Sequence, residues 1–134
     1  MVMSENVPQV LLVEDELLIR DLLQGALEEA GFEVAYAESG DAAIDLLQCS
    51  AGELVGVVTD INLGSETTGW DVARAARRAD LSIAVVYMSG GSAHEWAAEG
   101  VPDSAILAKP FAPAQLVVAL ATQLNNMGSS GREP

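Results

Sequence analysis

Short apolar runs alternate along the chain with stretches in which apolar residues recur at helical spacing. The run at residues 10–13 is typical of a buried strand, and the apolar positions from Leu17 to Leu27 fit one face of a helix that Gly31 ends. The same alternation continues along the rest of the chain. It predicts strands at residues 10–13, 32–37, 54–59, 81–88 and 104–108, and helices at 17–27, 39–50, 69–79, 92–99 and 113–124.

The order of these elements predicts the fold class. Strands that alternate with helices are joined by right-handed crossovers and form a parallel sheet. The runs at 10–13, 54–59 and 81–88 are almost continuously apolar, which indicates that helices cover both faces of the sheet. We therefore expect an α/β fold, a flavodoxin-like, doubly wound, five-stranded parallel sheet of order 2-1-3-4-5. The expected domain spans residues 8–126, between flexible termini at 1–7 and 127–134.

The chain of 134 residues is strongly acidic, with 20 Asp and Glu residues, 6 Lys and Arg residues and a formal net charge of −14. Surfaces that bind nucleic acids or anionic membranes depend on Lys and Arg, so this composition argues against both kinds of partner. Solubility explains most of the acidity, and the alternative is that some carboxylates surround a cation.

The cysteine content and the absence of targeting patterns predict a cytoplasmic protein. Cys49, the only cysteine, lies in the apolar pattern of a predicted helix, so we expect a buried, inert thiol. Residues 1–8 lack the basic and apolar regions of a signal peptide. No apolar run approaches the roughly 18 residues that a membrane span needs.

Polar residues follow four of the predicted strands at their carboxyl ends. Glu14 and Asp15 follow the first strand, Asp60 the third, Ser89 the fourth and Lys109 the fifth. In an open parallel sheet, ligands bind at the carboxyl ends of the strands, near the point where the strand order reverses. The order 2-1-3-4-5 therefore predicts that these residues share one crevice.

The three carboxylates of this crevice predict a metal site. Glu14, Asp15 and Asp60 repel one another unless a cation lies among them. Oxygen ligands without nearby His or Cys favour a hard ion, so we expect Mg²⁺, or Mn²⁺. The alternative is that Glu14, Asp15 and Glu16 only stabilise the positive end of the first helix.

The remaining crevice residues are typical of phosphoryl chemistry. A carboxylate such as Asp60 can attack an activated phosphoryl group and form an acyl phosphate. Lys109, the only lysine, can pair with Asp60 and later with phosphate oxygens. Its bond to Pro110 could be cis, which would aim the lysine inward, although most X–Pro bonds are trans. Ser89 and the backbone N–H of Gly90 can donate hydrogen bonds to a phosphate oxygen. The alternatives are a turn aspartate, a solvated loop lysine and an ordinary Ser-Gly-Gly turn.

These residues lie in four motifs: Leu-Val-Glu-Asp at 12–15, Val-Val-Thr-Asp at 57–60, Met-Ser-Gly at 88–90 and Lys-Pro-Phe at 109–111. In this order the motifs resemble the receiver domains of two-component response regulators, and in particular stand-alone receivers similar to the chemotaxis regulator. The resemblance covers residues 10–125. It implies a signalling domain that accepts a phosphoryl group, not an enzyme that turns over a separate substrate.

The resemblance implies a role for each site residue. Asp60 corresponds to the phosphoacceptor, Lys109 to the lysine that pairs with it, and Ser89 to the hydroxyl that moves toward the phosphoryl group. The metal ligands that it implies are Glu14, Asp15, Asp60 and the backbone carbonyl of Asn62.

The resemblance also implies the partners. The phosphodonor is a sensor histidine kinase or a histidine phosphotransfer protein. Phosphorylation is expected to alter a face formed by residues 92–99, 104–108 and 113–124, where a downstream protein docks. No output domain follows the last predicted helix, so we expect a stand-alone receiver. A receiver excised from a hybrid kinase or a phosphorelay protein has the same pattern.

The chain departs from the family pattern at three places. Ile106 lies three residues before the lysine, where the family usually has a Tyr or Phe that flips inward. The loop after the phosphoacceptor has Gly64 where a proline is common, and Gly69 comes one residue later than usual. The predicted helix at 92–99 is short, and its Trp96 is either a core anchor or a partner contact.

Other functions are possible on the same fold class. A small phosphohydrolase of the haloacid dehalogenase kind also uses a nucleophilic Asp, but it normally has a second Asp where this chain has Asn62. A flavin or nucleotide site is disfavoured because no G-x-G-x-x-G follows the first strand and no Walker A motif exists. Intact Asp60 and Lys109 argue against a scaffold that works without phosphorylation.

Overall fold

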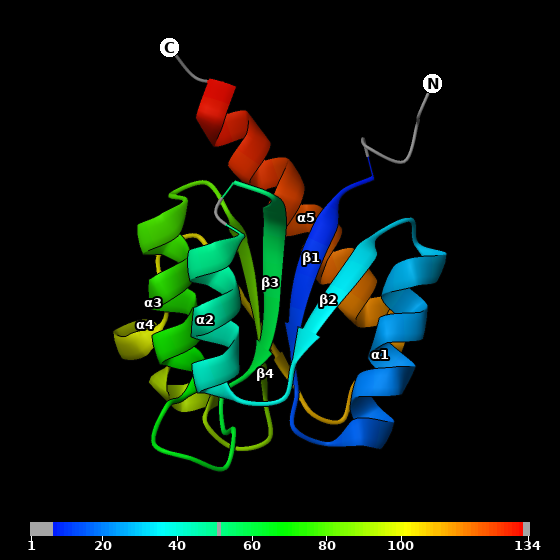
Figure 1. The fold of residues 1–134 in the computed structure, drawn as a ribbon, viewed down its shortest axis with the longest axis vertical. Helices are drawn as coiled ribbons and strands as arrows, with labels where there is room; N and C mark the ends of the chain where they lie inside the picture. The colour runs from blue at the N-terminus through cyan, green and yellow to red at the C-terminus, as the bar shows by residue number, and fades with distance from the viewer. Residues whose placement is uncertain (1–6, 51, 133–134) are drawn as a thin grey trace.

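The protein is an α/β sheet structure whose computed structural model describes residues 7–50 and 52–132. The described strands pair in parallel in the order β2-β1-β3-β4-β5, which confirms the predicted doubly wound fold (Figure 1). The strands are β1 (Gln9–Val13), β2 (Glu33–Ala37), β3 (Leu54–Asp60), β4 (Ala84–Ser89) and β5 (Ala105–Ala108). The helices are α1 (Leu17–Glu29), α2 (Gly40–Cys49), α3 (Gly69–Ala79), the 3-10 turn η2 (Ala93–Glu95), α4 (Trp96–Glu99) and α5 (Pro113–Arg132).

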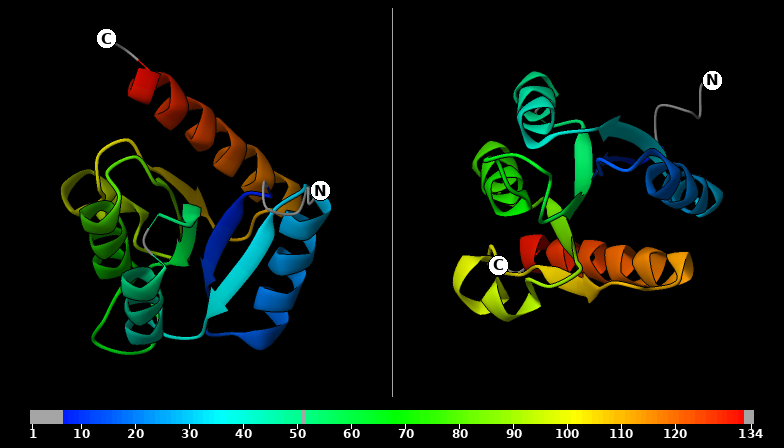
Figure 2. Two further views of the ribbon diagram at one scale, coloured as in Figure 1. Left: turned by 45° about the horizontal axis from the view of Figure 1, so that its top comes forward. Right: turned by 90° about the horizontal axis from the view of Figure 1, so that it is seen from below.

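Two apolar layers cover the two faces of the sheet. Successive residues of β1 point into opposite layers. Leu11 packs in the layer under α2 and α3, and Leu12 packs in the layer under α1 and α5. The helices lie on opposite sides of the sheet in Figure 2. Each fully buried leucine contributes roughly 2 kcal/mol through the hydrophobic effect, so the strands with buried residues on both faces fix the order of the sheet.

Local sequence signals start and end the helices as expected. Ser39 accepts the N–H of Ala42 through its side chain and begins α2. Thr68 and Asp71 form a capping box that begins α3. Gly31 follows α1 with a φ of 104°, a conformation that a side chain at Cβ disfavours.

The fourth strand begins later than predicted. It starts at Ala84, and Leu81 is 83% exposed in the turn that precedes it. The side chain of Asp80 accepts hydrogen bonds from the N–H and the hydroxyl of Ser82, at 3.0 and 2.8 Å. This side-chain turn overrides the apolar pattern, which therefore placed the start of the strand too early.

The last helix is longer than predicted, because α5 continues past the expected end at residue 124 to Arg132. Met127 is 8% exposed and its sulfur lies 3.9 Å from a guanidinium nitrogen of Arg77, so tertiary packing extends this helix. Of the predicted flexible termini, residues 1–6 and 133–134 lie outside the described residues. None of the described helices is long and apolar enough to cross a membrane.

Arg77 joins α3 to the turn before β4 and to the connection between β4 and β5. Its guanidinium donates hydrogen bonds to the backbone carbonyls of Ile83 at 2.8 Å, Asp103 at 2.9 Å and Pro102 at 2.5 Å. These bonds satisfy carbonyl groups outside the regular elements, and they fix the loop that leads into β5.

Two expectations about single side chains change. Cys49 is exposed at the end of α2, so the prediction of a buried thiol was wrong; the apolar face of α2 consists of its neighbours instead. Trp96 is neither a fully buried anchor nor a free surface residue. It is 37% exposed and its indole N–H donates to the hydroxyl of Ser104 at 3.0 Å.

We expect opposite stability effects from the same substitution at two glycines. A Cβ at Gly69 would overlap with the carbonyl oxygen of Asp60 and lie 2.8 Å from the Cα of Ile61, so Gly69→Ala must displace the end of β3. We expect it to lower the free energy of unfolding by about 2 kcal/mol or more. Gly25→Ala in α1, where nothing lies within 4 Å of the new atom, should raise it by about 0.5–1 kcal/mol.

Urea unfolding of both variants and the wild type measures these differences. If the Gly69→Ala variant is as stable as the wild type, a Cβ at residue 69 fits beside Asp60 without cost, which contradicts the expectation.

Candidate functional site

The polar residues predicted at the strand ends lie at one edge of the sheet, where Glu14, Asp15, Asp60 and Lys109 come close together and form the crevice. Glu14 and Asp15 follow β1, Asp60 ends β3, Ser89 ends β4 and Lys109 follows β5. Each position is set by the strand that precedes it, because the apolar register of β1, β3, β4 and β5 fixes where each strand stops. The crevice therefore lies at the carboxyl edge of the sheet, as expected.

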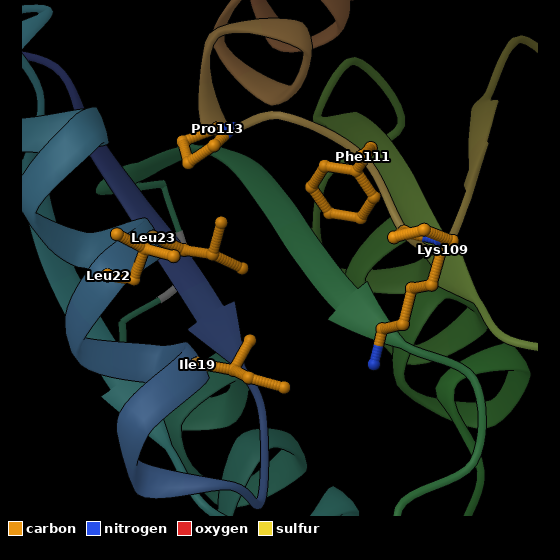
Figure 3. Close-up of a pocket in the computed structure, with 7 residues that line it drawn as sticks. Ile19, Leu22, Leu23, Lys109, Phe111 and Pro113 are labelled. Atoms are coloured by element: carbon orange, nitrogen blue, oxygen red, sulfur yellow. The ribbon is translucent and has the colours of Figure 1, made fainter.

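Lys109 is the cation of this crevice. Its Nζ lies 2.8 Å from Oδ2 of Asp60 and 3.6 Å from Oε1 of Glu14. Its backbone N–H donates to the carbonyl of Ser89 at 2.7 Å, and its bond to Pro110 is cis. The lysine side chain extends from the end of β5 into the crevice in Figure 3. One ammonium thus faces two buried carboxylates.

The three predicted acids form one group of possible metal ligands. One carboxylate oxygen from each of Glu14, Asp15 and Asp60 lies within 4.8 Å of the others. Oε2 of Glu14 accepts the N–H of Glu16 at 3.1 Å, whereas its buried Oε1 has no hydrogen-bond partner among the described residues. An all-oxygen group with a free buried acceptor fits a hard divalent ion such as Mg²⁺.

Burial and charge change the protonation of two of these groups. Glu14 is 0% exposed, and burial raises its pKa from 4.5 to about 7, opposed by the N–H of Glu16 and assisted by the charge of Asp60. Burial lowers the pKa of Lys109, but the hydrogen bond and charge of Asp60 and the charge of Glu14 outweigh it and raise the pKa overall. Lys109 therefore stays charged beside its two acids.

Ser89 lies at the end of β4 with its hydroxyl engaged in the next turn. It is 2% exposed, and its Oγ accepts the N–H groups of Gly91 at 3.2 Å and Ser92 at 2.7 Å. A hydroxyl that accepts two hydrogen bonds keeps its own proton for donation. The turn alternative from the sequence is thus present, and the hydroxyl keeps a proton that it can donate.

Asn62 is not part of the acid group. Its side chain is exposed and its amide nitrogen lies 3.5 Å from the hydroxyl of Ser92. The same loop passes close to Asp15, because a Cβ at Gly64, whose φ is 75°, would lie 3.4 Å from Oδ2 of Asp15. The loop after Asp60 therefore borders the crevice.

An apolar groove beside the crevice was not predicted. It has a volume of about 270 Å³ and is lined by Ile19, Leu22, Leu23, Lys109, Pro110, Phe111 and Pro113. Ile19 and Leu23 of α1 face Phe111 across it in Figure 3. The sequence contained one signal for this groove. The apolar pattern of α1 is wider than a single buried face, because it includes the exposed residues Leu17, Leu18 and Leu22.

Several curated proteins are similar to this chain in sequence. The probable transcriptional regulatory protein SilR of Salmonella typhimurium is 32% identical over 118 residues, which are 87% of this chain and 50% of SilR. The alginate biosynthesis transcriptional regulatory protein AlgB of Pseudomonas aeruginosa is 36% identical over 90% of this chain and 27% of AlgB. The chain thus spans half or less of the length of these relatives.

Solved structures of receivers are similar in fold. A response regulator receiver protein from Sinorhizobium medicae has a TM-score of 0.87 and 43% identity, over 91% of this chain and 98% of that chain. NtrX from Brucella abortus has a TM-score of 0.78 and 27% identity, over 91% of this chain and 28% of that chain.

The family comparison agrees with both sets of relatives. The model of the response regulator receiver domain matches residues 10–121, which include every strand-end residue of the crevice. The chain therefore belongs to the response regulator receiver domain family of two-component systems.

Proposed function

We propose that Asp60 accepts a phosphoryl group from the phosphohistidine of a sensor histidine kinase or a histidine phosphotransfer protein. The observation that carries this proposal is the 2.8 Å pair of Asp60 and Lys109 beside the two further carboxylates Glu14 and Asp15. This arrangement combines a nucleophile, a fixed cation and metal ligands at one strand edge. The chain would thus catalyse only its own phosphorylation and dephosphorylation.

The transfer makes one bond and breaks one bond. An oxygen of Asp60 attacks the phosphorus, the P–N bond to the donor imidazole breaks, and its electron pair stays on the imidazole nitrogen, which is then protonated. Lys109 moves its contact from the carboxylate to the phosphoryl oxygens, and the Ser89 hydroxyl and the Gly90 N–H donate to them. Attack of water on the phosphorus later breaks its bond to the Asp60 oxygen, which releases inorganic phosphate and restores the carboxylate.

We propose Mg²⁺, or Mn²⁺, as the cofactor. Its ligands would be oxygens of Glu14, Asp15 and Asp60 together with the backbone carbonyl of Asn62. When bound, the ion supplies positive charge that offsets the charge of the transferring phosphoryl group. Oε1 of Glu14 supports this proposal, because this buried oxygen accepts no hydrogen bond among the described residues and has only the ammonium of Lys109, at 3.6 Å, near it.

The apolar groove is the proposed docking site of the phosphodonor, an amphipathic helix that carries the phosphohistidine. Lys109 belongs both to the groove and to the crevice, so a helix seated against Ile19, Leu22 and Phe111 would bring its histidine beside Asp60.

Because such donors are phosphorylated from ATP, we propose a cytoplasmic location.

A downstream protein is proposed to dock on the face of α4, β5 and α5. From residue 113 to 131, the sequence of α5 has no charged residue, in a chain of net charge −14. The uncharged surface of α5 desolvates at lower cost than the acidic remainder, which favours this helix as part of a protein contact. The relatives carry additional length, so a stand-alone receiver and a receiver of a longer protein both fit this proposal.

We expect phosphoramidate and Mg²⁺ to add one phosphoryl group to the wild-type protein. Asp60→Asn should show no gain, because the amide cannot act as the nucleophile, and EDTA should abolish the gain. Intact-mass spectrometry measures both results. A gain in the Asp60→Asn variant would place the acceptor elsewhere and contradict the proposal.

We expect the stability of the metal-free protein to fall as pH rises from about 4.5 to about 7. The pKa of Glu14 is raised from 4.5 to about 7 in the folded state, so the folded state binds this proton more tightly than the unfolded state. The corresponding stabilisation is present below the lower value and is lost above the higher one. A shift of this size corresponds to at most ~3 kcal/mol.

Glu14→Gln, which stays neutral, should remove this fall and be more stable than the wild type at pH 8 in EDTA. Urea unfolding across the pH range measures it, with Glu28→Gln on the exposed side of α1 as the control. An unchanged slope in the Glu14→Gln variant would assign the pH dependence to another group.

We expect Gly91→Glu to slow the loss of the phosphoryl group several-fold, because a carboxylate at the entry of the attacking water repels developing hydroxide. Nothing lies within 4 Å of a Cβ at Gly91, so the substitution needs no change in the backbone. Gly91→Ala separates the effect of the charge from that of the Cβ. Hydrolysis followed by intact mass tests it, and equal rates in all three proteins would refute it.

A further inference from the structure

Two side chains of β4 hold the two ends of the segment that leads to β5. Tyr87 and Ser89 are two positions apart, so they lie on the same face of the strand. The hydroxyl of Ser89 accepts the N–H groups of Gly91 and Ser92 at the start of the segment. The hydroxyl of Tyr87 accepts the N–H of Val101 at its end, at 3.0 Å.

The end of the segment has further hydrogen bonds. The hydroxyl of Ser104 accepts the indole N–H of Trp96 at 3.0 Å and donates to the carbonyl of Val101 at 2.6 Å. Arg74 of α3 donates to the carboxylate of Glu99 at 2.6 Å and to its carbonyl at 3.1 Å. The chain from Trp96 onward is therefore fixed by side chains of β4, of α3 and of the residue that precedes β5.

The start of the segment is held more weakly. Gly90 and Gly91 leave open space, since nothing lies within 4 Å of a Cβ at either position. Residues 93–95 form a single 3-10 turn with exposed side chains. The link from the Asn62 amide to the Ser92 hydroxyl is 3.5 Å long and exposed. Residues 90–95 can therefore move at a lower energetic cost than α4.

The ring of Tyr87 is immobilised by the core. It is fully buried, and its centroid lies 4.7 Å from that of Trp70. Its direct neighbour across the sheet is Ile106, so β4 contributes the aromatic ring of this layer while β5 contributes an aliphatic side chain. A ring packed in this way holds its hydroxyl in one place.

We propose that Tyr87 is a positioning residue that confines the response to phosphorylation to residues 90–95 and keeps α4 in place. The inference rests on the proposed function, because it requires Ser89 to respond to a phosphoryl group on Asp60. As Ser89 moves, the turn that its hydroxyl holds moves with it, while the Tyr87–Val101 bond holds the end of the segment and the Trp96–Ser104 bond holds the start of α4. The surface that changes is then the exposed turn that carries His94 and Glu95.

Amide NMR of the full chain tests this proposal, with beryllofluoride and Mg²⁺ as a stable substitute for the phosphoryl group. In the wild type, we expect amide signals to shift throughout residues 90–95. The signals of residues 96–101 and the hydrogen exchange rate of the Val101 amide should remain unchanged.

The variant Tyr87→Phe keeps the ring and removes only the hydroxyl. We expect its Val101 amide to exchange about tenfold faster than in the wild type, and the response to beryllofluoride to spread into residues 96–101. The matched control is Tyr36→Phe on β2, where the ring is 51% exposed and keeps its contact with Arg20. It should behave as the wild type.

If Tyr87→Phe does not fold, the wild type still tests the proposal, because faster exchange of the Val101 amide when beryllofluoride is bound would overturn it.

Other outcomes distinguish a failure of the role proposed for Tyr87 from a failure of the proposed phosphoacceptor function. A wild-type response that already includes residues 96–101, or a Tyr87→Phe response confined to 90–95, overturns the role of Tyr87 and leaves the phosphoacceptor intact. If beryllofluoride and Mg²⁺ change no amide signal of the wild type, as expected for Asp60→Asn, the result contradicts the proposed function, and the role of Tyr87 is overturned with it.

Discussion

The arrangement at the carboxyl edge of the sheet depends on how the charges of two carboxylates at the ends of buried apolar strands are compensated. Removing a charge from water costs on the order of several kcal/mol unless a partner compensates for it. Here one ammonium serves both acids, with Nζ of Lys109 at 2.8 Å from Asp60 and 3.6 Å from Glu14. That ammonium is in place because β5 pairs with β4 and the Lys109 N–H binds the carbonyl of Ser89. The apolar register and the polar site are therefore one arrangement, and a slip of β5 would remove the cation from both acids.

The parts that follow from strand register could be predicted from the sequence. Uninterrupted apolar runs indicate strands with both faces covered, and the residues after them must meet at one edge. Glu14, Asp15, Asp60 and Lys109 were placed in this way, and their proximity is confirmed. The role of each in chemistry stays a proposal, because proximity alone does not distinguish a phosphoacceptor from a buried ion-pair group.

The parts that depend on distant contacts could not be predicted. Leu81 belongs to an apolar run, but the side chain of Asp80 makes a turn there. The residues after 124 look like a polar tail, yet the contact of Met127 with Arg77 continues the helix. The hydroxyl of Tyr87 binds an N–H 14 residues away, and no local pattern marks such a pair. In each case a side-chain contact outweighs the local preference that the sequence displays.

The bonds of Arg77 have a consequence for how the protein responds to its solvent. In a chain of net charge −14, this arginine binds backbone carbonyls and not carboxylates. Hydrogen bonds to neutral carbonyls are little affected by dissolved ions, whereas repulsion among the surplus carboxylates is screened by them. Added salt therefore weakens what opposes the fold more than what holds it together.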